Sequence, residues 1–515
     1  MKHVKALIFD FGNVLCTWIL PNDGTIPPTK LKQIMSSDIW FDYERGRYTT
    51  AEDCYSNLED RFAIRSKELD LVLEKARKSL KIQSATLEFL TKLKTEHPHL
   101  RVYGLTNTPL PEQDSVYSVA SRWPVFDHIY ISGNLGMRKP DISCYKAVLQ
   151  DIGLPAEAVV FIDDLAENIL SAQSIGIHSI LFENHEQLAR QLENVLGDPV
   201  KRGTDFLIAN AKRMDSVTES GITIHENFAQ LLILDVIGNR ELVRLETWDR
   251  TWNYFIGKPC DRLICPSELT TGDFPNDLDT TSIALSIIPT EKSVLWSVMD
   301  EMLTFTNEDG IFMTYFDHSR PRVDPVVCVN ILYLFCQHGR EIEAARTFEW
   351  VLDVLRNRAY QAGSRYYPSP DVFLYFLTRL SRVVRDGSRR EELLSLLQPR
   401  VTERIGTDGS VVSLSTRILA CCSMGIVNHC DVPKLLALQS RDGGWPVDWI
   451  YKLGSSGLKV GNRGLNTALA TKAIEASGAY VDPTLTESRA WWQFVDWQGC
   501  DNMLPFLKRK EFVIH

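Results

Sequence analysis

Hydrophobic and polar residues follow two different patterns along this chain, and the pattern changes near residue 200. Before that point, apolar runs separated by helical stretches each predict a buried parallel strand, at residues 5–10, 101–105 and 158–162. After the Gly-Asp-Pro segment at 197–199 this alternation stops, and the chain predicts successive helices of ordinary length. We therefore expect a multi-domain protein with an α/β domain, a linker or lead-in helix, and an all-α domain, at residues 1–200, 201–220 and 221–515.

Polar residues follow each predicted strand of the first domain. Together with a lysine that precedes a proline, the set comprises Asp10, Thr106, Asn107, Lys139, Asp163 and Asp164. Ligands of open α/β sheets gather at the carboxyl ends of the strands, so we expect these side chains to share a site. The set suits phosphoryl transfer. In that reaction a carboxylate attacks phosphorus, carboxylate-bound Mg²⁺ neutralises charge, and Lys with a hydroxyl binds the other oxygens.

This combination resembles the haloacid-dehalogenase-like phosphatase superfamily, with its Rossmann-like fold, over the whole first domain. The resemblance implies that Asp10 is the nucleophile and a Mg²⁺ ligand. It assigns phosphate binding to Thr106, Asn107 and Lys139. It places the remaining groups of the Mg²⁺ site at Gly12 (backbone carbonyl), Asp164 and, in support, Asp163.

One position departs from the usual pattern of that superfamily. Gly12 stands where relatives carry a second Asp that acts as general acid and base, and losing such a group costs about 10²–10⁴ in rate. Some relatives with an Asp-x-Gly-Asn loop are nonetheless phosphatases, so Asn13 and water can compensate. An active phosphatase, a slow one and a scaffold all stay open. Residues 20–90 resemble the helical cap that this superfamily inserts after its first strand.

The second domain contains a cluster of carboxyls and hydroxyls at residues 273–282. Such a cluster suits protonation of a carbon–carbon double bond, because an alkene is a poor base and needs a neutral, strongly donating acid. Asp277 and Asp279 would resist double ionisation when close together, so one proton is retained near neutral pH. The hydroxyls of Thr280 and Thr281 can donate to the carboxylate that forms. The alternative is a simple helix cap.

The Asp-x-Asp-Thr-Thr pattern resembles the acid motif of class II terpene cyclases, in which the middle Asp, here Asp279, delivers the proton. Turns that contain Asp-Gly follow helices and precede apolar stretches, as in helical hairpins that close into an (α/α) barrel, at residues 307–310, 406–409 and 440–443. The last turn leads to Trp445, and its segment resembles the Gln–Trp repeat of triterpene cyclases and the β domain of terpene synthases.

Two basic segments are candidates for binding a diphosphate. Arg320 and Arg322 flank a proline, and guanidinium forks suit diphosphate oxygens. Lys459 and Arg463 form the second candidate. Both segments resemble parts of bacterial and fungal drimane-type cyclases, and a surface network of Arg and Asp is the alternative for each of them.

Aromatic residues are candidates for the walls around a carbocation, because their π-faces attract positive charge. Trp445, Trp449 and Tyr451 follow the last Asp-Gly turn, and a second aromatic cluster lies at residues 366–376. A place in the hydrophobic core is the alternative for each of them.

The two domains in this order resemble the drimane-type sesquiterpene synthases over nearly the whole chain. The resemblance implies an isoprenoid diphosphate substrate, farnesyl diphosphate, which Asp279 protonates and which closes to a bicyclic drimane-type diphosphate. Mg²⁺-dependent dephosphorylation by the N-terminal domain would then give the alcohol. One alternative is a cyclase with an inactive N-terminal domain and a phosphorylated product, and another is a phosphatase with a helical interaction domain.

Charge and composition narrow the setting. The net charge of −10 argues against a general nucleic-acid binder and provides no basic patch for anionic lipid. The 11 cysteines show neither zinc spacing nor a disulfide framework. We expect no membrane span, no signal peptide and a cytoplasmic location, because no apolar run is long enough and the N-terminus leads directly into the first motif. Whether the chain forms a homo-oligomer stays open.

Overall fold

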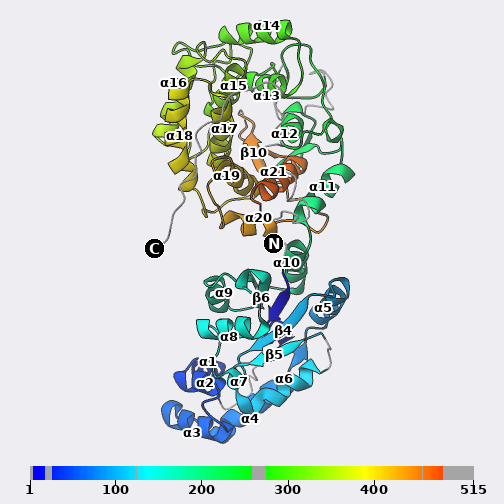
Figure 1. Ribbon diagram of the computed structural model, residues 1–515, viewed down its shortest axis with the longest axis vertical. Helices are drawn as coiled ribbons and strands as arrows, with labels where there is room; N and C mark the ends of the chain where they lie inside the picture. Colours follow the sequence, from blue (N-terminus) through cyan, green and yellow to red (C-terminus); the bar gives the residue numbers. More distant parts are fainter. Residues whose placement is uncertain (1–3, 18–25, 122–124, 258–273, 455, 479–515) are drawn as a thin grey trace, which may run out of the picture. The chain divides into compact units, whose positions relative to one another are not determined.

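The structure is a computed structural model that describes residues 4–17, 26–121, 125–257, 274–454 and 456–478 (Figure 1). Asp273, the first residue of the acid cluster, lies outside the described residues. So do residues 479–515, the last part of the predicted helical domain. Within the described ranges, no helix is both long and apolar enough to cross a membrane.

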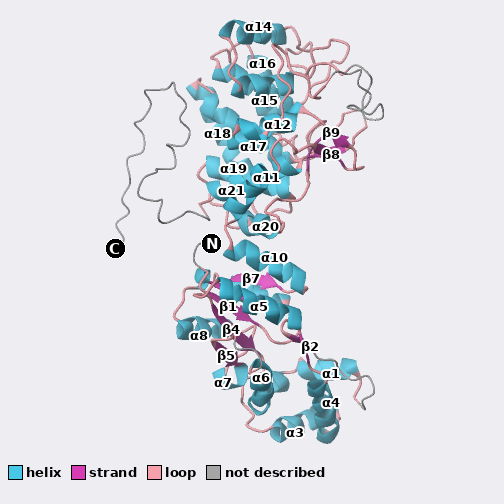
Figure 2. Cartoon of the chain, turned by 90° about the vertical axis from the view of Figure 1, so that its right-hand side faces the viewer, coloured by secondary structure: helices cyan, strands magenta, loops and turns pink. Residues whose placement is uncertain are grey.

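A five-stranded sheet forms the centre of the first domain, with the strand order β5-β4-β1-β6-β7 (Figure 2). All of its pairings are parallel, and the strands are β1 (Ala6–Phe9), β4 (Arg101–Thr106), β5 (His128–Ile131), β6 (Val159–Asp163) and β7 (His178–Leu181). Ala6 pairs with Arg101 on one side and with Val159 on the other. The three strands predicted from the sequence are therefore neighbours, and their carboxyl ends meet at one edge.

Helices cover both faces of this sheet, because successive residues of a strand point to opposite faces. Leu7 and Phe9 share an apolar cluster with α5 (Ser84–Glu96) and α10 (His185–Leu196). Ala6 and Ile8 share another with α8 (Ile142–Ile152) and α9 (Ala166–Gln173). The domain also contains η1 (Leu110–Glu112), α6 (Gln113–Ala120), α7 (Ser132–Leu135) and η2 (Ala156–Ala158).

A helical cap is inserted between β1 and α5. Its helices are α1 (Pro28–Met35), α2 (Asp38–Glu44), α3 (Ala51–Phe62) and α4 (Ser66–Lys78), and their apolar residues form a separate core. The chain enters and leaves the cap through the antiparallel pair β2 (Cys16–Thr17) and β3 (Lys81–Ile82). The predicted cap range of 20–90 runs too far, because Leu87 and Leu90 of α5 pack against the sheet.

An inner ring of helices builds the second domain: α12 (Asn227–Ile237), α13 (Leu278–Ile287), α15 (Pro325–Gln337), α17 (Pro370–Val383), α19 (Val411–Ser423) and α21 (Arg463–Ala476). Each packs against the next, and α21 returns to α12. Packed outside this ring are α11 (Pro199–Ala209), α16 (Ala345–Arg356), α18 (Gly387–Thr402) and α20 (Asp431–Ala437). The apolar residues of α14 (Lys292–Leu303) belong to the same hydrophobic core as the ring. This is the (α/α) barrel expected from the turns.

A small sheet is added to the barrel, with the order β10-β11-β8-β9. It contains β8 (Ser216–Thr218), β9 (Thr223–Ile224), β10 (Trp449–Lys452) and β11 (Lys459–Gly461), and η3 (Arg240–Leu242) follows α12. The all-α prediction did not include these strands. Residues 201–220, expected as a linker or lead-in helix, belong to the barrel domain, because α11 packs against α21 and β8 pairs with β11.

Candidate active sites

The first candidate site lies at the carboxyl edge of the parallel sheet. The backbone N–H of Asp10, after β1, donates to the carbonyl of Ile162 in β6 at 2.9 Å, which keeps the two strand ends adjacent. Lys139 lies between two carboxylates, with its Nζ 2.8 Å from Asp10 Oδ1 and 2.6 Å from Asp163 Oδ2. Lys139 is buried, and a buried ammonium group requires such partners. The structure thus brings the predicted nucleophile and the predicted phosphate-binding lysine together.

Burial and neighbouring charges set the ionisation of this cluster. Burial raises the pKa of Asp10 to about 7, with help from Asp163 and Asp164, although Lys139 opposes the shift. Burial by itself would lower the pKa of Lys139, but Asp10 and Asp163 outweigh it and hold this pKa above its usual value. Lys139 therefore stays positively charged at neutral pH, as a phosphate-binding group must.

The adjacent carboxylates of Asp163 and Asp164 have different surroundings. Asp163 Oδ1 accepts hydrogen bonds from the backbone N–H of Leu165 and from Asn168 Nδ2, both at 2.9 Å, while its Oδ2 faces the lysine. Since its oxygens are occupied by donors, Asp163 fits a supporting role better than that of a metal ligand. Asp164 is half-buried and accepts from Asn13 Nδ2 at 2.9 Å.

The donors at this edge fit a hard divalent cation. Ligand oxygens of Asp10, Asp163 and Asp164 lie within 4.8 Å of one another, and Mg²⁺ prefers oxygen ligands of this kind. At Gly12, an added Cβ would meet only Asp10 Oδ2, at 3.8 Å. The loop therefore leaves space beside that carboxylate oxygen, which suits a cation held by Asp10, Asp164 and the backbone of Gly12.

The polar residues after β4 contact each other and the lysine loop. Thr106 Oγ1 is buried and lies 3.0 Å from Thr108 Oγ1. Asn107 Oδ1 accepts from the backbone N–H of Lys139, and its Nδ2 donates to the carbonyl of the same residue, both at 2.9 Å. Asn107, predicted to bind phosphate, thus spends its amide on holding the Lys139 loop in place.

The second candidate site lies at the start of α13. Asp277 is the N-cap of this helix, and its Oδ1 accepts from the backbone N–H of Thr280 at 2.6 Å. Its Oδ2 is buried with no hydrogen-bond partner among the described residues. Asp277 therefore both caps the helix and keeps one buried carboxyl oxygen without a hydrogen bond from the described part of the chain. Burial, together with Asp279, raises the pKa of Asp277 to about 8.

Asp279 lies in the first turn of α13 and is buried. Its Oδ1 accepts from Asn330 Nδ2 of α15 at 2.8 Å, and its Oδ2 accepts from the Tyr367 hydroxyl at 2.5 Å. Burial raises the pKa of Asp279 to about 7, although these two hydrogen bonds lower it. The carboxyl is therefore partly protonated near neutral pH, and the donors that would stabilise its conjugate base are already in place.

The threonine hydroxyls of the motif have other surroundings than we expected. Thr281 Oγ1 accepts from the backbone N–H of Trp252 at 2.8 Å, while the Thr280 side chain lies against Asp277 and opposes the rise in the pKa of that carboxyl. Asn330 and Tyr367 donate to the carboxylate of Asp279 in place of the predicted threonine hydroxyls. Asn330 carries a signal in the sequence, because it is a lone amide within the apolar run of α15.

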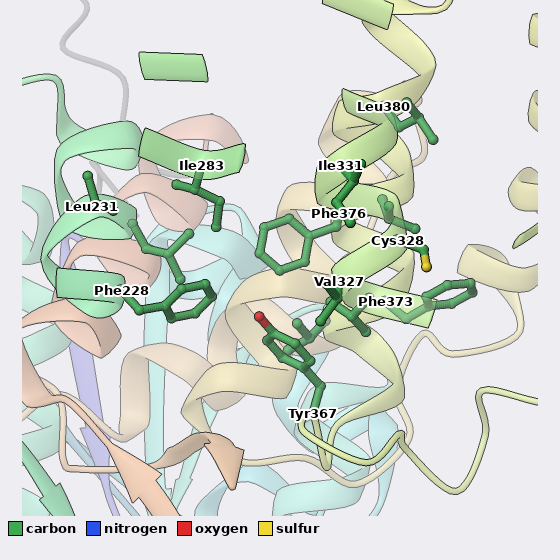
Figure 3. Packing of buried hydrophobic residues seen from close by; sticks show 14 of the residues in the cluster. Phe228, Leu231, Ile283, Val327, Cys328, Ile331, Tyr367, Phe373, Phe376 and Leu380 are labelled. Carbon is green, nitrogen blue, oxygen red and sulfur yellow. The ribbon is translucent and has the colours of Figure 1, made fainter. Parts of the chain in front are cut away.

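Aromatic rings surround the acid. Figure 3 shows Phe228 and Phe376 beside the Tyr367 hydroxyl, and the ring centroids of Phe228 and Tyr367 are 6.2 Å apart. Trp449 is half-buried at the start of β10. Trp445 lies in a different apolar cluster, and its Nε1 donates to the carbonyl of Leu435 at 2.8 Å. Its position fits the barrel framework and not a wall around Asp279.

The basic residues predicted to bind a diphosphate differ in whether a carboxylate already pairs with them. Arg320 pairs with Asp317 at 3.2 Å, and Arg463 forms two hydrogen bonds to Asp442, at 2.8 and 2.9 Å. Lys459 is exposed in β11.

Arg322 is half-buried, and no carboxylate of the described residues forms an ion pair with its guanidinium. Burial and the nearby Asp277 raise the pKa of Tyr315, while the positive charge of Arg322 lowers it. Arg365, which the sequence analysis did not single out, lies over Tyr366 with 5.9 Å between its Cζ and the ring centroid. The Tyr315 and Tyr366 rings are 6.2 Å apart, with the Arg365 guanidinium beside Tyr366, while the charge of Arg322 acts on Tyr315.

Comparison with known proteins matches both domains. The family model of the sesquiterpene cyclase astC-like C-terminal domain matches residues 200–338, and that of the haloacid dehalogenase-like hydrolases matches residues 49–182. Drimenol cyclase drtB of Aspergillus calidoustus is 44% identical over 475 residues, which are 92% of this chain and 88% of that protein. The chain belongs to the drimane-type sesquiterpene synthases.

This drimane-type synthase is thus an enzyme with a terpene cyclase domain and a haloacid-dehalogenase-like hydrolase domain. Sesquiterpene phosphatase astK of Aspergillus oryzae is 31% identical over 193 residues, 38% of this chain and 97% of that protein. Among solved structures, the magnesium complex of a haloacid-dehalogenase family enzyme, bt-2542 from Bacteroides thetaiotaomicron, is 25% identical, covers 35% of this chain and 94% of that chain, and has a TM-score of 0.29.

Proposed function

We propose that the barrel domain protonates farnesyl diphosphate through Asp279 and closes two rings, and that the α/β domain then removes phosphate with Mg²⁺. The observation that carries the proposal is the surroundings of Asp279. It is a buried carboxyl with a pKa raised to about 7, and both of its oxygens accept hydrogen bonds, from Asn330 and Tyr367. A group of this kind is neutral before the reaction and stabilised as an anion after it.

The protonation step follows from this arrangement. Asp279 gives its proton to the distal double bond, whose electrons form the new C–H bond and leave a tertiary cation. Each further double bond then closes a ring, and the diphosphate stays attached throughout. The guanidinium groups of Arg322 and Arg365 are the groups we assign to the diphosphate oxygens, because charge-assisted bonds to planar forks suit them.

In the α/β domain, Asp10 would attack the terminal phosphorus while Lys139 binds phosphoryl oxygens. Mg²⁺, when bound by Asp10, Asp164 and the backbone of Gly12, supplies charge neutralisation there. Removing both phosphates of the cyclised product takes two successive rounds of the same chemistry. An idle first domain, with a phosphorylated product, is the second candidate, because Gly12 stands where an acid–base group belongs.

Asp279→Asn tests the cyclase assignment. An amide cannot protonate an alkene, so incubation with farnesyl diphosphate and Mg²⁺ should yield no bicyclic product by mass spectrometry, before or after added phosphatase. Hydrolysis of small phosphate esters should persist. Asp309→Asn is the matched control, because it makes the same change at an exposed turn of the same domain and should leave cyclisation intact. Bicyclic product from Asp279→Asn would move the acid to another group, first of all to Asp277.

A further inference from the structure

A second buried carboxyl, Glu226, lies in the barrel domain apart from the acid motif. It is only 2% exposed and caps α12, where its Oε2 accepts from the backbone N–H of Ala229 at 2.8 Å. Its Oε1 accepts from Ser216 Oγ at 2.5 Å and from the Tyr451 hydroxyl at 3.0 Å. No positively charged side chain of the described residues pairs with it. Serine or asparagine would cap the helix without a buried charge, so capping does not account for the carboxyl.

A chain of hydroxyls leads to this carboxyl. The Tyr254 hydroxyl donates to the Tyr451 hydroxyl at 2.7 Å, and Tyr451 donates to Glu226. All three residues are buried. Both hydrogen bonds point towards Glu226, so a proton that reaches the Tyr254 oxygen can pass to the carboxylate in two short transfers. Burial raises the pKa of Glu226 to about 7, which makes it a stronger base than an ordinary glutamate.

The same aromatic surface connects this chain with the acid. Phe228 lies between Tyr451 and Tyr367, with ring centroids 5.6 and 6.2 Å away, and Tyr367 is hydrogen-bonded to Asp279. Figure 3 shows Phe228 facing the Tyr367 hydroxyl from α12, the helix that Glu226 caps.

A second series of rings leads back towards the motif from the other end of the hydroxyl chain. The ring centroids of Tyr254 and Phe274 are 6.1 Å apart, and those of Phe274 and Tyr315 are 5.6 Å apart. The centroids of Tyr315 and Tyr366 are 6.2 Å apart. Ring faces of this kind stabilise a cation and offer it no nucleophile. Two series of ring contacts therefore lead from the Tyr254–Tyr451 pair towards Asp279, one through Phe228 and Tyr367 and the other through Phe274, Tyr315 and Tyr366.

We propose that the Tyr254–Tyr451–Glu226 chain accepts the proton whose loss ends the cyclisation. The inference rests on the proposed function. A cation made at the distal double bond moves through the substrate as the rings close, so it ends away from Asp279, and a different base is needed there. The C–H bond next to the cationic carbon breaks and its electrons form the double bond of the product. Its proton goes to the Tyr254 oxygen, the Tyr254 proton to Tyr451, and the Tyr451 proton to Glu226, which later returns it to solvent.

Glu226→Gln tests this step with little change of shape. The amide oxygen can still cap α12, but the amide nitrogen donates towards Tyr451, so the chain no longer ends on a base. With farnesyl diphosphate and Mg²⁺, substrate consumption should stay close to that of the wild type. The ratio of unsaturated to hydroxylated drimane products should fall by about tenfold or more, because losing a general base slows proton loss and lets water capture the cation.

Tyr254→Phe and Tyr451→Phe remove the hydroxyls and leave the Glu226 cap, and they should shift the product ratio in the same direction. Tyr360→Phe is the matched control, because the Tyr360 hydroxyl is buried in the same domain with no hydrogen-bond partner among the described residues. It should leave the ratio unchanged. Melting temperatures of all variants separate a loss of stability from a loss of the base.

Unchanged product ratios in Glu226→Gln and Tyr254→Phe overturn the inference, as does a wild type that releases only hydroxylated drimanes. If Glu226→Gln does not fold, the ratio from Tyr254→Phe decides. A wild type that forms no bicyclic product at all would instead contradict the proposed function. The two failures are thus distinguished by the wild-type product alone.

Discussion

At the scale of single residues, Asp279 differs from an ordinary carboxyl through its surroundings rather than its chemistry. Burial disfavours its charged form, while Asn330 and Tyr367 donate to both of its oxygens. The first effect keeps the proton in place, and the second stabilises the anion once the proton has left. An acid for an alkene needs both, because either effect alone would give a weak donor or a group that is already ionised.

The pH dependence of cyclisation follows from the raised pKa of Asp279, about 7. The reaction needs the protonated form, whose fraction falls as pH rises. The rate of ring closure should therefore be constant at low pH and begin to decline near pH 7. Well above that pH the rate should fall about tenfold for each further pH unit. Single-turnover formation of the bicyclic diphosphate between pH 5.5 and 9 measures this. A rate that rises across this range would mean that the ionised carboxylate is the active form.

Tyr367→Phe should move this profile to higher pH, since the lost hydrogen bond lowers the pKa of Asp279. The rate at low pH should fall as well, because the carboxylate loses a donor that stabilises it. A midpoint that moves to lower pH would contradict the role of Tyr367, and the same assay measures both effects.

The sequence predicts the acid but not its partners. Asp277 and Asp279 stand within one short motif, whose spacing is visible in the chain. Asn330 and Tyr367 lie 51 and 88 residues from Asp279, and only the closure of the barrel brings them to it. Tyr367 belongs to an aromatic cluster that the sequence does suggest, yet nothing local distinguishes its hydroxyl from its neighbours.

At the scale of elements, Asp324 connects the two segments that carry these partners. It is fully buried at the start of α15, the helix of Asn330, where its Oδ1 accepts from the backbone N–H of Val326 at 2.9 Å. Its Oδ2 accepts from the backbone N–H of Tyr366 at 3.1 Å. One carboxylate thus caps the helix and fixes the loop that presents Tyr367.

Asp324→Asn should lower the kcat of cyclisation by about 10²-fold with little change in KM, because misplaced catalytic groups cost about that much. The amide can cap the helix but cannot also accept from Tyr366. Asp386→Asn is the matched control, since Asp386 caps the outer helix α18 in the same way. Its Oδ1 accepts from the backbone N–H of Ser388 at 2.9 Å. If both variants lose activity in proportion to their melting temperatures, Asp324 has only a structural role.

Arg322→Ala and Arg365→Ala test the diphosphate assignment. Each should raise KM for farnesyl diphosphate by about tenfold or more, because a hydrogen bond to a charged group contributes about 1.5–3 kcal/mol. The kcat should change little if the contacts are equally strong in the transition state. Arg358→Ala, which removes an exposed guanidinium paired with Glu403, should have no effect. Unchanged kinetics in the first two variants would place the diphosphate elsewhere.

Most elements are predictable where their pattern is local and long. The strands at β1, β4 and β6 and the barrel helices follow from apolar periodicity and from the turns between them. The short strands β8 to β11 do not, because two to four residues carry no period and the pairing of β8 with β11 joins residues more than 200 positions apart, such as Val217 and Gly461. β5 and β7 are the edge strands of the central sheet, and their apolar runs are too brief to predict a strand from the sequence.

At the scale of the whole molecule, we propose that the two domains act one after the other. Cyclisation by protonation leaves the diphosphate intact, and the α/β domain contains the groups that would hydrolyse it. A phosphatase of Aspergillus oryzae matches 38% of this chain across 97% of its own length, so that protein has no room for a barrel domain as well. Covalent attachment therefore suggests that one domain acts on the other's product.

Asp10→Asn decides whether the two domains act in sequence. It removes the proposed nucleophile and a proposed Mg²⁺ ligand, while Asp279 and its partners are untouched. Ring closure precedes hydrolysis, so the variant should consume farnesyl diphosphate at the wild-type rate and accumulate a bicyclic diphosphate. Added alkaline phosphatase should convert this to the alcohol that the wild type releases.

Asp114→Asn, at an exposed position of the same domain, should behave as wild type. Identical product mixtures from wild type and Asp10→Asn would mean that a cyclase is joined to an idle hydrolase domain. This is the main alternative, because Gly12 stands where an acid–base group belongs. Farnesol as the only alcohol from the wild type would instead mean that hydrolysis precedes cyclisation. In that case the diphosphate would be lost before the proton arrives, and Arg322 and Arg365 would have no role in ring closure.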